Sequence, residues 1–346
     1  MKVIEDKGSP CKNMYFKKNG GFLFRVLYYE RRISAEFFHS LTDGTGAIEF
    51  LKTLCAEYLS IKGYNIEKSK YILDIDDLPS KEEMEDAFIK YAVKEKFLSR
   101  GERKAYHPLG TFEPPGILHL TTGILDVDAV LEVSRSMKVS MTEYLAAVLI
   151  YVLYLNQKKY SYSDIKPITV SVPVNLRKHF QSKTLRNFSL FVNTGIDPGL
   201  GDYTFEEIVS MVHHFMRYSL NDKFLRAQIS ANVAAERNPV LRIIPLIVKN
   251  ISLSAAFSLF GDTRISSTLT NVGKVIVPED MEEHIERFEA MLSSTLLKPV
   301  NCSVISFKNV LTVNFTRTIK ESEVEKEFFR FLVKKGLHVK VESNYE

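Results

Sequence analysis

At 346 residues, with 45% hydrophobic and 25% charged residues, the chain can bury a large core and has the composition of a globular protein. The 46 basic and 42 acidic residues leave a net charge of +4 and include no basic block interleaved with aromatic residues, so a nucleic-acid partner is not indicated. Three scattered cysteines, Cys11, Cys55 and Cys302, predict neither a disulfide framework nor a metal site and favour a reducing, cytoplasmic location.

The first predicted elements are two strands that form an antiparallel pair. After a polar lead-in to Gly21, residues 22–29 read as a strand with apolar residues on both faces, so we expect it inside a sheet and covered on both sides. A turn at 30–32 leads to a second strand, in which Ile33, Ala35 and Phe37 share one face.

A histidine follows the second strand in the block FFHSLTDG at 37–44. His39 continues the apolar face of the strand, so we expect it to point into the interior. Apolar residues then recur at helical spacing and predict a helix from Thr45. The positive end of that helix disfavours imidazolium, and a general base must be neutral. His39 is therefore the candidate base. The alternative is a satisfied core histidine, with Asp43 serving only as the N-cap.

The remaining elements alternate between helix and strand without strict repeats. Residues 62–104 are charged and predict a connector, with a capping box at Ser80 and Glu83 ahead of a surface helix. A proline and glycine cluster at 107–116 precedes the second half of the chain. There we predict helices at 126–138, 140–157, 204–220, 240–260 and 322–336, and strands at 117–125, 168–173, 186–196, 264–278 (with a turn at Asn271 and Gly273), 286–294, 302–307, 310–315 and 337–343.

Neither of the two most apolar stretches predicts a membrane span. The stretch at 144–155 is too short, and the one at 240–260 contains Arg242, Pro245 and Lys249. Both are read as buried helices.

Three blocks in this order and spacing resemble the acyl-CoA-dependent acyltransferase and condensation-domain superfamily: HSLTDG at 39–44, PVNLR at 173–177 and TNVG at 270–273. Within it, residues 31–59, 173–188 and 327–344 look most like the alcohol acetyltransferase group. The resemblance extends from about Arg25 to Asn344.

This resemblance implies an α/β fold of two chloramphenicol-acetyltransferase-like lobes, each with a mixed sheet, and a tunnel between them. It makes His39 the general base that activates an alcohol hydroxyl for direct attack on an acyl-CoA, without an acyl-enzyme. Acyl-CoA, with acetyl as the acyl group we expect, is then a co-substrate, and no cofactor or metal is bound. Asp43 is implied to be chiefly structural and to pair with Arg177, although Arg177 could instead be a surface cation.

The resemblance also assigns supporting roles. Gly44 is implied to let the backbone turn and the donor approach closely. Thr270, Asn271 and Gly273 are implied to face the tunnel, where an amide and a backbone N–H could orient the acceptor or hold the oxyanion. An ordinary turn at Asn271 and Gly273 is the simpler explanation of that segment.

We predict an N-terminal lobe at 1–104 and a C-terminal lobe at 105–346. Two departures from the family pattern stand out. Phe38 occupies the position of a usual first histidine, and the N-terminal lobe lacks room for a strand and helix that relatives carry. We therefore expect a shortened lobe, and an uncovered sheet edge would favour self-association.

Two other functions stay open. The chain could be a free-standing condensation-type enzyme that makes an amide or ester from an amine or alcohol acceptor and a donor on an acyl carrier protein. It could also be a non-catalytic relative that acts as a binding protein.

Overall fold

The computed structural model describes residues 2–12, 14–67, 71–93, 103–160, 164–237 and 262–344, together with residues 243 and 245. The small N-terminal elements are β1 (Ile4–Glu5), β2 (Phe24–Tyr29), β3 (Arg32–Phe37), α1 (Gly44–Ile61), α2 (Lys81–Met84) and α3 (Ala87–Tyr91). The later elements are β4 (His119–Asp126), α4 (Val127–Ser136), α5 (Met141–Tyr160), β5 (Ile168–Asn175), α6 (Arg177–Phe180), β6 (Ser189–Ile196), α7 (Phe205–Ser219), α8 (Asp222–Arg237), β7 (Ser267–Val275), α11 (Glu279–Glu282), β8 (Val300–Phe307), β9 (Val310–Arg317), α12 (Glu323–Lys334) and β10 (Lys340–Ser343).

A mixed seven-stranded sheet forms the centre of the molecule, in the order β10-β4-β9-β8-β7-β5-β6. The β5–β7 and β7–β8 pairs are parallel, whereas the other neighbours are antiparallel. Every residue of β8 is buried, as expected for a central strand covered on both faces. The predicted α/β class with mixed sheets is confirmed.

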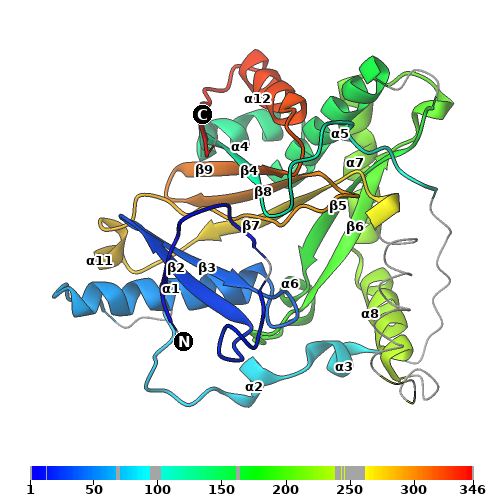
Figure 1. Cartoon of the computed structure of the whole chain (residues 1–346). Coiled ribbons are helices and arrows are strands. Elements are labelled where there is room, and N and C mark those ends of the chain that lie inside the picture. The colour runs from blue at the N-terminus through cyan, green and yellow to red at the C-terminus, as the bar shows by residue number, and fades with distance from the viewer. Residues whose placement is uncertain are drawn as a thin grey trace.

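One face of this sheet is covered by helices. Figure 1 shows α4, α5, α7 and α12 along the upper side of the sheet. The long helix α5 begins at the predicted capping box, where Ser140 Oγ accepts a hydrogen bond from Glu143 N at 3.3 Å and Glu143 Oε2 accepts one from Ser140 N at 2.7 Å. Its apolar residues from Tyr144 to Leu153 are almost all buried in the main core.

The opposite face carries α1 and an irregular crossing segment. Ala56 and Leu59 of α1 pack against Ile305 and Phe307 of β8. Residues 285–295 form no strand, so the predicted strand at 286–294 is wrong. The carbonyl groups of this crossing segment accept hydrogen bonds from side chains of β8 and β9 and form no backbone ladder. The donor and acceptor residues are Asn301 and Ser293, Ser303 and Ala290, Thr312 and Phe288, and Thr316 and Leu292.

The N-terminal sheet has the order β1-β2-β3, with β1 parallel to β2 and β2 antiparallel to β3. As predicted, β2 lies inside the sheet. It is covered on both faces at its middle, where the successive residues Val26 and Leu27 are buried, but not at its end, where Tyr28 and Tyr29 are 47% and 46% exposed. The outer edge of β2 is also occupied, by β1 and by the Asn19 amide, which donates to the carbonyl groups of Phe22 and Phe24 at 2.9 and 2.8 Å. The expected uncovered edge is therefore wrong at this strand, and self-association stays a prediction.

The connector differs from its prediction in one respect. The capping box at Ser80 and Glu83 is present, but the single surface helix is divided into α2 and α3. Glu85 is extended between them, and its carbonyl accepts from Thr184 Oγ1 at 2.9 Å. The predicted helix at 240–260 falls almost wholly outside the described residues.

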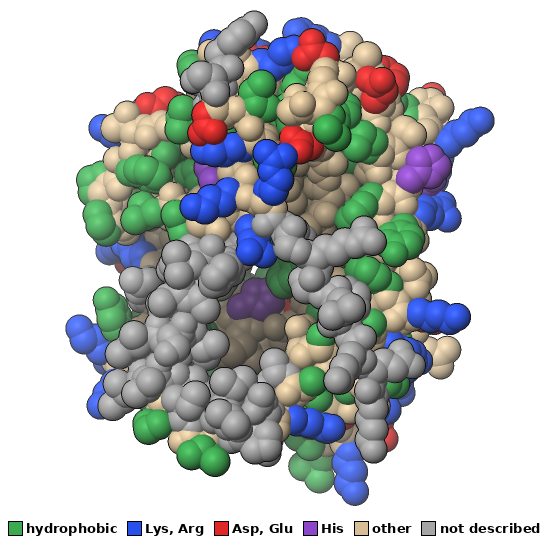
Figure 2. Space-filling view, turned by 90° about the vertical axis from the view of Figure 1, so that its right-hand side faces the viewer, with side chains coloured by type: hydrophobic (Ala, Val, Ile, Leu, Met, Phe, Trp, Pro, Cys, Tyr) green, Lys and Arg blue, Asp and Glu red, His purple; other side chains and the backbone are tan. Residues whose placement is uncertain are grey.

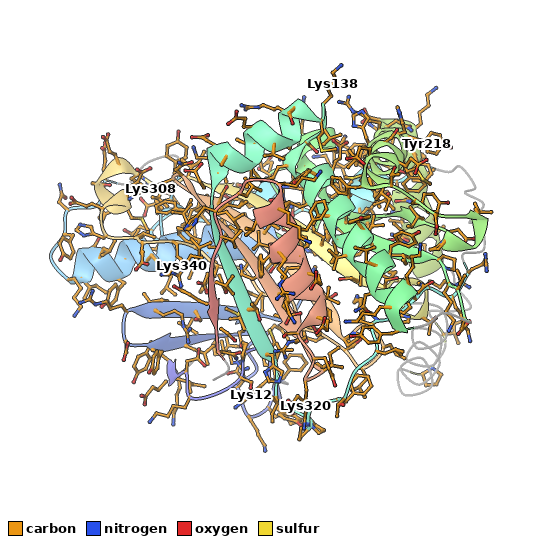
Figure 3. The ribbon with its side chains drawn as sticks, turned by 90° about the horizontal axis from the view of Figure 1, so that it is seen from above. Lys12, Lys138, Tyr218, Lys308, Lys320 and Lys340 are labelled. Atoms are coloured by element: carbon orange, nitrogen blue, oxygen red, sulfur yellow. The ribbon has the colours of Figure 1, made fainter. Side chains whose placement is uncertain are left out.

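None of the helices in the described part of the chain is by itself long and apolar enough to cross a membrane, although α4 and α5, bent by 80° at their junction, meet that test as a pair. Seen from above, Lys138 lies at the upper edge of the view, and Lys12 and Lys320 lie at the lower edge (Figure 3).

Candidate active site

The candidate site forms where three distant segments meet: the turn after β3 with the start of α1, the end of β5 with α6, and the residues that lead into β6. The Asp43 side chain is 6% exposed and joins all three. Its Oδ1 accepts hydrogen bonds from the N–H groups of Thr45 and Gly46 at 3.1 and 3.3 Å. Its Oδ2 accepts from Arg177 Nη1 at 2.7 Å and from Phe188 N at 2.8 Å. Asp43 is thus both the N-cap of α1 and the partner of a buried cation.

Arg177 completes this junction. Its side chain is 10% exposed, and the guanidinium donates to the carbonyl groups of Thr184 at 2.7 Å and Arg186 at 2.6 Å besides pairing with Asp43. The predicted Asp43–Arg177 pair is confirmed, and the alternative of a surface cation is wrong. Because an arginine presents five donors in a fixed fork, one side chain can hold the loop at 184–186 and the start of α1 together.

Packing within the chain requires a glycine at Gly46 and not at Gly44, whose implied role in the approach of the donor stays a prediction. A side chain at Gly44 would meet only the Val272 methyl groups, at 3.7 and 3.8 Å, which is ordinary contact. A Cβ at Gly46 would overlap Thr42 Oγ1 and the carbonyl oxygen of Leu185. Thr42 Oγ1 itself donates to that carbonyl at 2.6 Å, so the first turn of α1 is packed directly onto the loop before β6.

His39 is exposed, which corrects the expectation of a buried imidazole. The strand ends at Phe37 and the chain turns at once, with Leu41 N donating to the Phe38 carbonyl at 2.9 Å, so the alternation of faces does not extend to His39. The core-histidine alternative is wrong for the same reason. The Asp43 carboxylate caps the positive end of α1. Its negative charge opposes the effect that this helix end was expected to have on the His39 imidazole.

The nearest polar partner of the imidazole is Asn187. Its Nδ2 lies 3.4 Å from His39 Nδ1 and 3.4 Å from the His39 carbonyl oxygen. On the face shown in Figure 2, one histidine side chain lies inside a hollow. The imidazole is accessible to solvent and lies beside an amide, and in the described residues it has no contact with a carboxylate. Such an imidazole can accept a proton from a bound hydroxyl or amine.

The TNVG segment lies within β7 and reaches the start of α1 through Val272. The predicted turn is instead a bulge in a continuous strand, with a register shift between Asn271 and Gly273 and φ of +97° at Gly273. Asn271 Nδ2 donates to Thr142 Oγ1, and its Oδ1 accepts from Gly273 N, both at 2.9 Å. That N–H is therefore already used, which does not favour an oxyanion role for it. Thr270 is half-buried opposite Ser303.

Sequence reasoning missed three residues of this junction: Gly46, Asn175 and Asn187. The side chain of Asn175 accepts from Arg177 N at 3.0 Å and donates to Thr45 Oγ1 at 2.9 Å, so it joins β5 to α1. All three residues lie inside the longer ranges 31–59 and 173–188 that carried the sequence resemblance, but only the folded chain shows what they touch. Within the described residues, no group of three or more His, Cys, Asp or Glu side chains is placed to hold a metal.

No protein-family model matches the chain, and no curated protein matches it. Solved structures do resemble it. Polyketide synthase associated protein 5 from Mycobacterium tuberculosis is 14% identical with a TM-score of 0.51, and the match covers 90% of this chain and 76% of that one. The nonribosomal peptide synthetase FmoA3 is 12% identical with a TM-score of 0.50, over 97% of this chain and 36% of that one. The trichothecene 15-O-acetyltransferase TRI3 from Fusarium sporotrichioides is 14% identical with a TM-score of 0.49, over 90% of this chain and 69% of that one. The chain shares its fold with the first two of these structures.

Proposed function

We propose that this chain is an acyltransferase that moves an acyl group, acetyl first among the candidates, from CoA to the hydroxyl of a small alcohol. His39 acts as the general base. One observation carries the proposal: the imidazole is accessible and its polar contact among the described residues is a neutral amide, while the carboxylate of Asp43 has both oxygens engaged by protein donors.

The reaction needs no covalent intermediate on the protein. His39 takes the proton of the acceptor hydroxyl as its oxygen bonds to the thioester carbonyl carbon, and the tetrahedral adduct then expels the CoA thiolate. The imidazolium returns the proton to the thiolate, so the base is regenerated and the products are an ester and CoA. A positioned base of this kind typically contributes about 100- to 10,000-fold.

The fold is consistent with this assignment but does not determine it, because proteins of one fold catalyse different reactions and the residues of the site determine which one. The division into lobes at 104/105 and the tunnel between them are part of the proposal. Asp43 and Arg177 serve it by holding the loops on which the base and its partner lie. Thr270, Asn271 and Gly273 shape the wall beside α1.

Thiol release from acetyl-CoA in the presence of a panel of alcohols tests the proposal, with the ester identified by mass spectrometry. We expect release that depends on the acceptor. Release only with amines, or only from a donor on a carrier protein, would establish the condensation-type alternative instead. No acceptor-dependent release from either donor with any acceptor would leave a binding protein and contradict the enzyme assignment.

A further inference from the structure

An open cavity of about 720 Å³ lies between the end of α4, the start of α5 and the end of α7. Its size is in the range of small-ligand pockets, about 300–1,000 Å³. Three cations line it: Arg135 in the last turn of α4, Lys138 just after α4, and Arg217 in the last turn of α7. Figure 3 shows Lys138 and Tyr218, the residue after Arg217, in the upper part of the same view. In the described part of the chain, none of the three cations has an ion-pair partner.

One carboxylate also lines the cavity, and protein groups already hold it. Glu143 is 6% exposed. Its Oε2 accepts a hydrogen bond from Ser140 N at 2.7 Å, and its Oε1 lies 3.3 Å from His213 Nδ1. The positive end of α5, which begins at Met141, opens on the same cavity. Three cations against one carboxylate leave an excess of two positive charges among the lining residues.

Lys138 occupies a backbone position that usually belongs to glycine. The helix α4 ends in a Schellman motif, in which Lys138 N donates to the Arg135 carbonyl at 2.9 Å and Val139 N donates to the Ser134 carbonyl at 3.1 Å. Lys138 is left-handed, with φ of +60°, and a side chain is unfavourable in that conformation. The backbone therefore favours a glycine here, which makes the lysine side chain a candidate for binding rather than for folding.

The lining matches the chemistry of a phosphate monoester. Such a group carries about two negative charges near pH 7, and an arginine guanidinium presents a planar fork of donors to phosphate oxygens. Half-buried Val139 and Leu220 add apolar surface beside the cations, which suits the organic part of a ligand. We propose that this cavity binds the phosphate monoester of a small organic molecule, with Arg135, Lys138 and Arg217 as its ligands.

The cavity is joined to the wall of the candidate active site. Thr142, in the first turn of α5, accepts a hydrogen bond from Asn271 Nδ2 at 2.9 Å. The next residue, Val272, lies against the start of α1 at Gly44. A phosphate monoester reaches this place either on the ribose of CoA or on a free metabolite. The first source rests on the proposed function, whereas the phosphate site itself does not.

Titration with inorganic phosphate tests the site, with the unfolding midpoint as the readout and the ionic strength held constant with chloride. A ligand that binds only the folded chain raises this midpoint. We expect a saturable rise, with a half-saturating concentration about tenfold higher in Lys138→Gly and in Arg217→Ala, because each variant loses a charge-assisted contact. Lys138→Gly also relieves the left-handed backbone, so without phosphate its midpoint should equal or exceed that of the wild type. Lys138→Arg should respond like the wild type. So should the control Lys17→Ala, which removes an exposed cation from the N-terminal segment.

CoA and dephospho-CoA, which differ only in the 3′-phosphate, identify the source. Tighter binding of CoA, with the difference lost in Lys138→Gly, would assign the site to CoA. Equal binding of the two, together with stabilisation by phosphate, would assign it to a free metabolite. Equal binding without stabilisation by phosphate would overturn the proposal, and so would responses of Lys138→Gly and Arg217→Ala that match the wild type. None of these measurements needs turnover, so the phosphate site and the acyltransferase function can fail separately.

Discussion

At the scale of single residues, the junction depends on one carboxylate. Asp43 accepts four hydrogen bonds, two at the helix cap and two from the segment at 177–188. A capping residue alone needs one oxygen. The second oxygen faces the buried Arg177, and this combination explains why an aspartate and not an asparagine suits the position.

Replacement of Asp43 by alanine leaves the Arg177 guanidinium buried without its counter-charge. We expect Asp43→Ala to lower the free energy of unfolding by about 3–5 kcal/mol, as for other broken buried pairs. Urea denaturation measures this loss. Asp164→Ala is the control, since Asp164 pairs with Lys166 in solvent, with side chains 69% and 41% exposed. A midpoint for Asp43→Ala that moves no more than that of the control would show that the pair does not hold the junction.

Burial disfavours the thiolate form of all three cysteines, Cys11, Cys55 and Cys302. Burial raises the pKa of the Cys55 thiol to about 11 and that of the Cys11 thiol to about 12, and it raises the pKa of the fully buried Cys302 thiol as well. Only thiolate reacts quickly, and three pH units below its pKa about one thiol in a thousand is ionised.

The native protein should accordingly show almost no fast reaction with a thiol reagent at pH 8, and three thiols should react once it is unfolded. Counting the released chromophore with and without guanidinium checks this expectation. One rapidly reacting thiol in the native protein would show that one of these sites is open. The result also decides whether thiol release from CoA can be read without a background from the protein.

At the scale of elements, the start of α1 is where local sequence and long-range packing meet. Asp43 and the apolar spacing that follows predict the helix, because capping and periodicity are local signals. That Gly46 must lack a side chain depends on Thr42 and on the loop at Leu185. No local pattern marks this contact.

Two neighbouring glycines test this difference. Gly46→Ala forces a methyl group into Thr42 and the Leu185 backbone, and we expect a loss of about 1–3 kcal/mol in the free energy of unfolding. Gly44→Ala adds a methyl group where there is room, within a helix, and we expect it to be neutral or stabilising by up to about 1 kcal/mol. Thermal unfolding of both variants compares them directly. Equal midpoints would mean that the loop moves aside and that the close approach at Gly46 does not matter.

The crossing segment shows the opposite case, where a local pattern misleads. Residues 286–294 alternate enough to predict a strand, yet their carbonyl groups are satisfied by side chains of Asn301, Ser303, Thr312 and Thr316. These four polar residues are buried in β8 and β9, strands that also bury the polar side chains of Ser306, Asn314 and Arg317. Such side-chain pairing between distant segments leaves no period in the sequence, so the prediction could not anticipate it.

At the scale of the whole molecule, the seven strands from β4 to β10 and the helices α4, α5, α7 and α12 follow from periodicity, capping boxes and turn residues, whereas α6, α8 and α11 were not predicted. The predicted ion pair between Asp43 and Arg177 came from a resemblance in three motifs, because residues 134 apart carry no local sign of contact. The exposure of His39 and the partnership with Asn187 depend on where a turn and a loop meet in space. The similarity to solved structures at 12–14% identity supports the architecture of the chain, and the reaction has to be tested by experiment.

The most direct test of the central claim is the rate of acceptor-dependent CoA release by His39→Ala, compared with the wild type and with His338→Ala, which removes an exposed histidine between α12 and β10. The base acts only in the transition state, so the variant should keep its fold, seen as an unchanged unfolding midpoint, and lose about 100- to 10,000-fold in kcat/KM. His338→Ala should match the wild type. A folded His39→Ala protein with near wild-type ester formation would contradict the account.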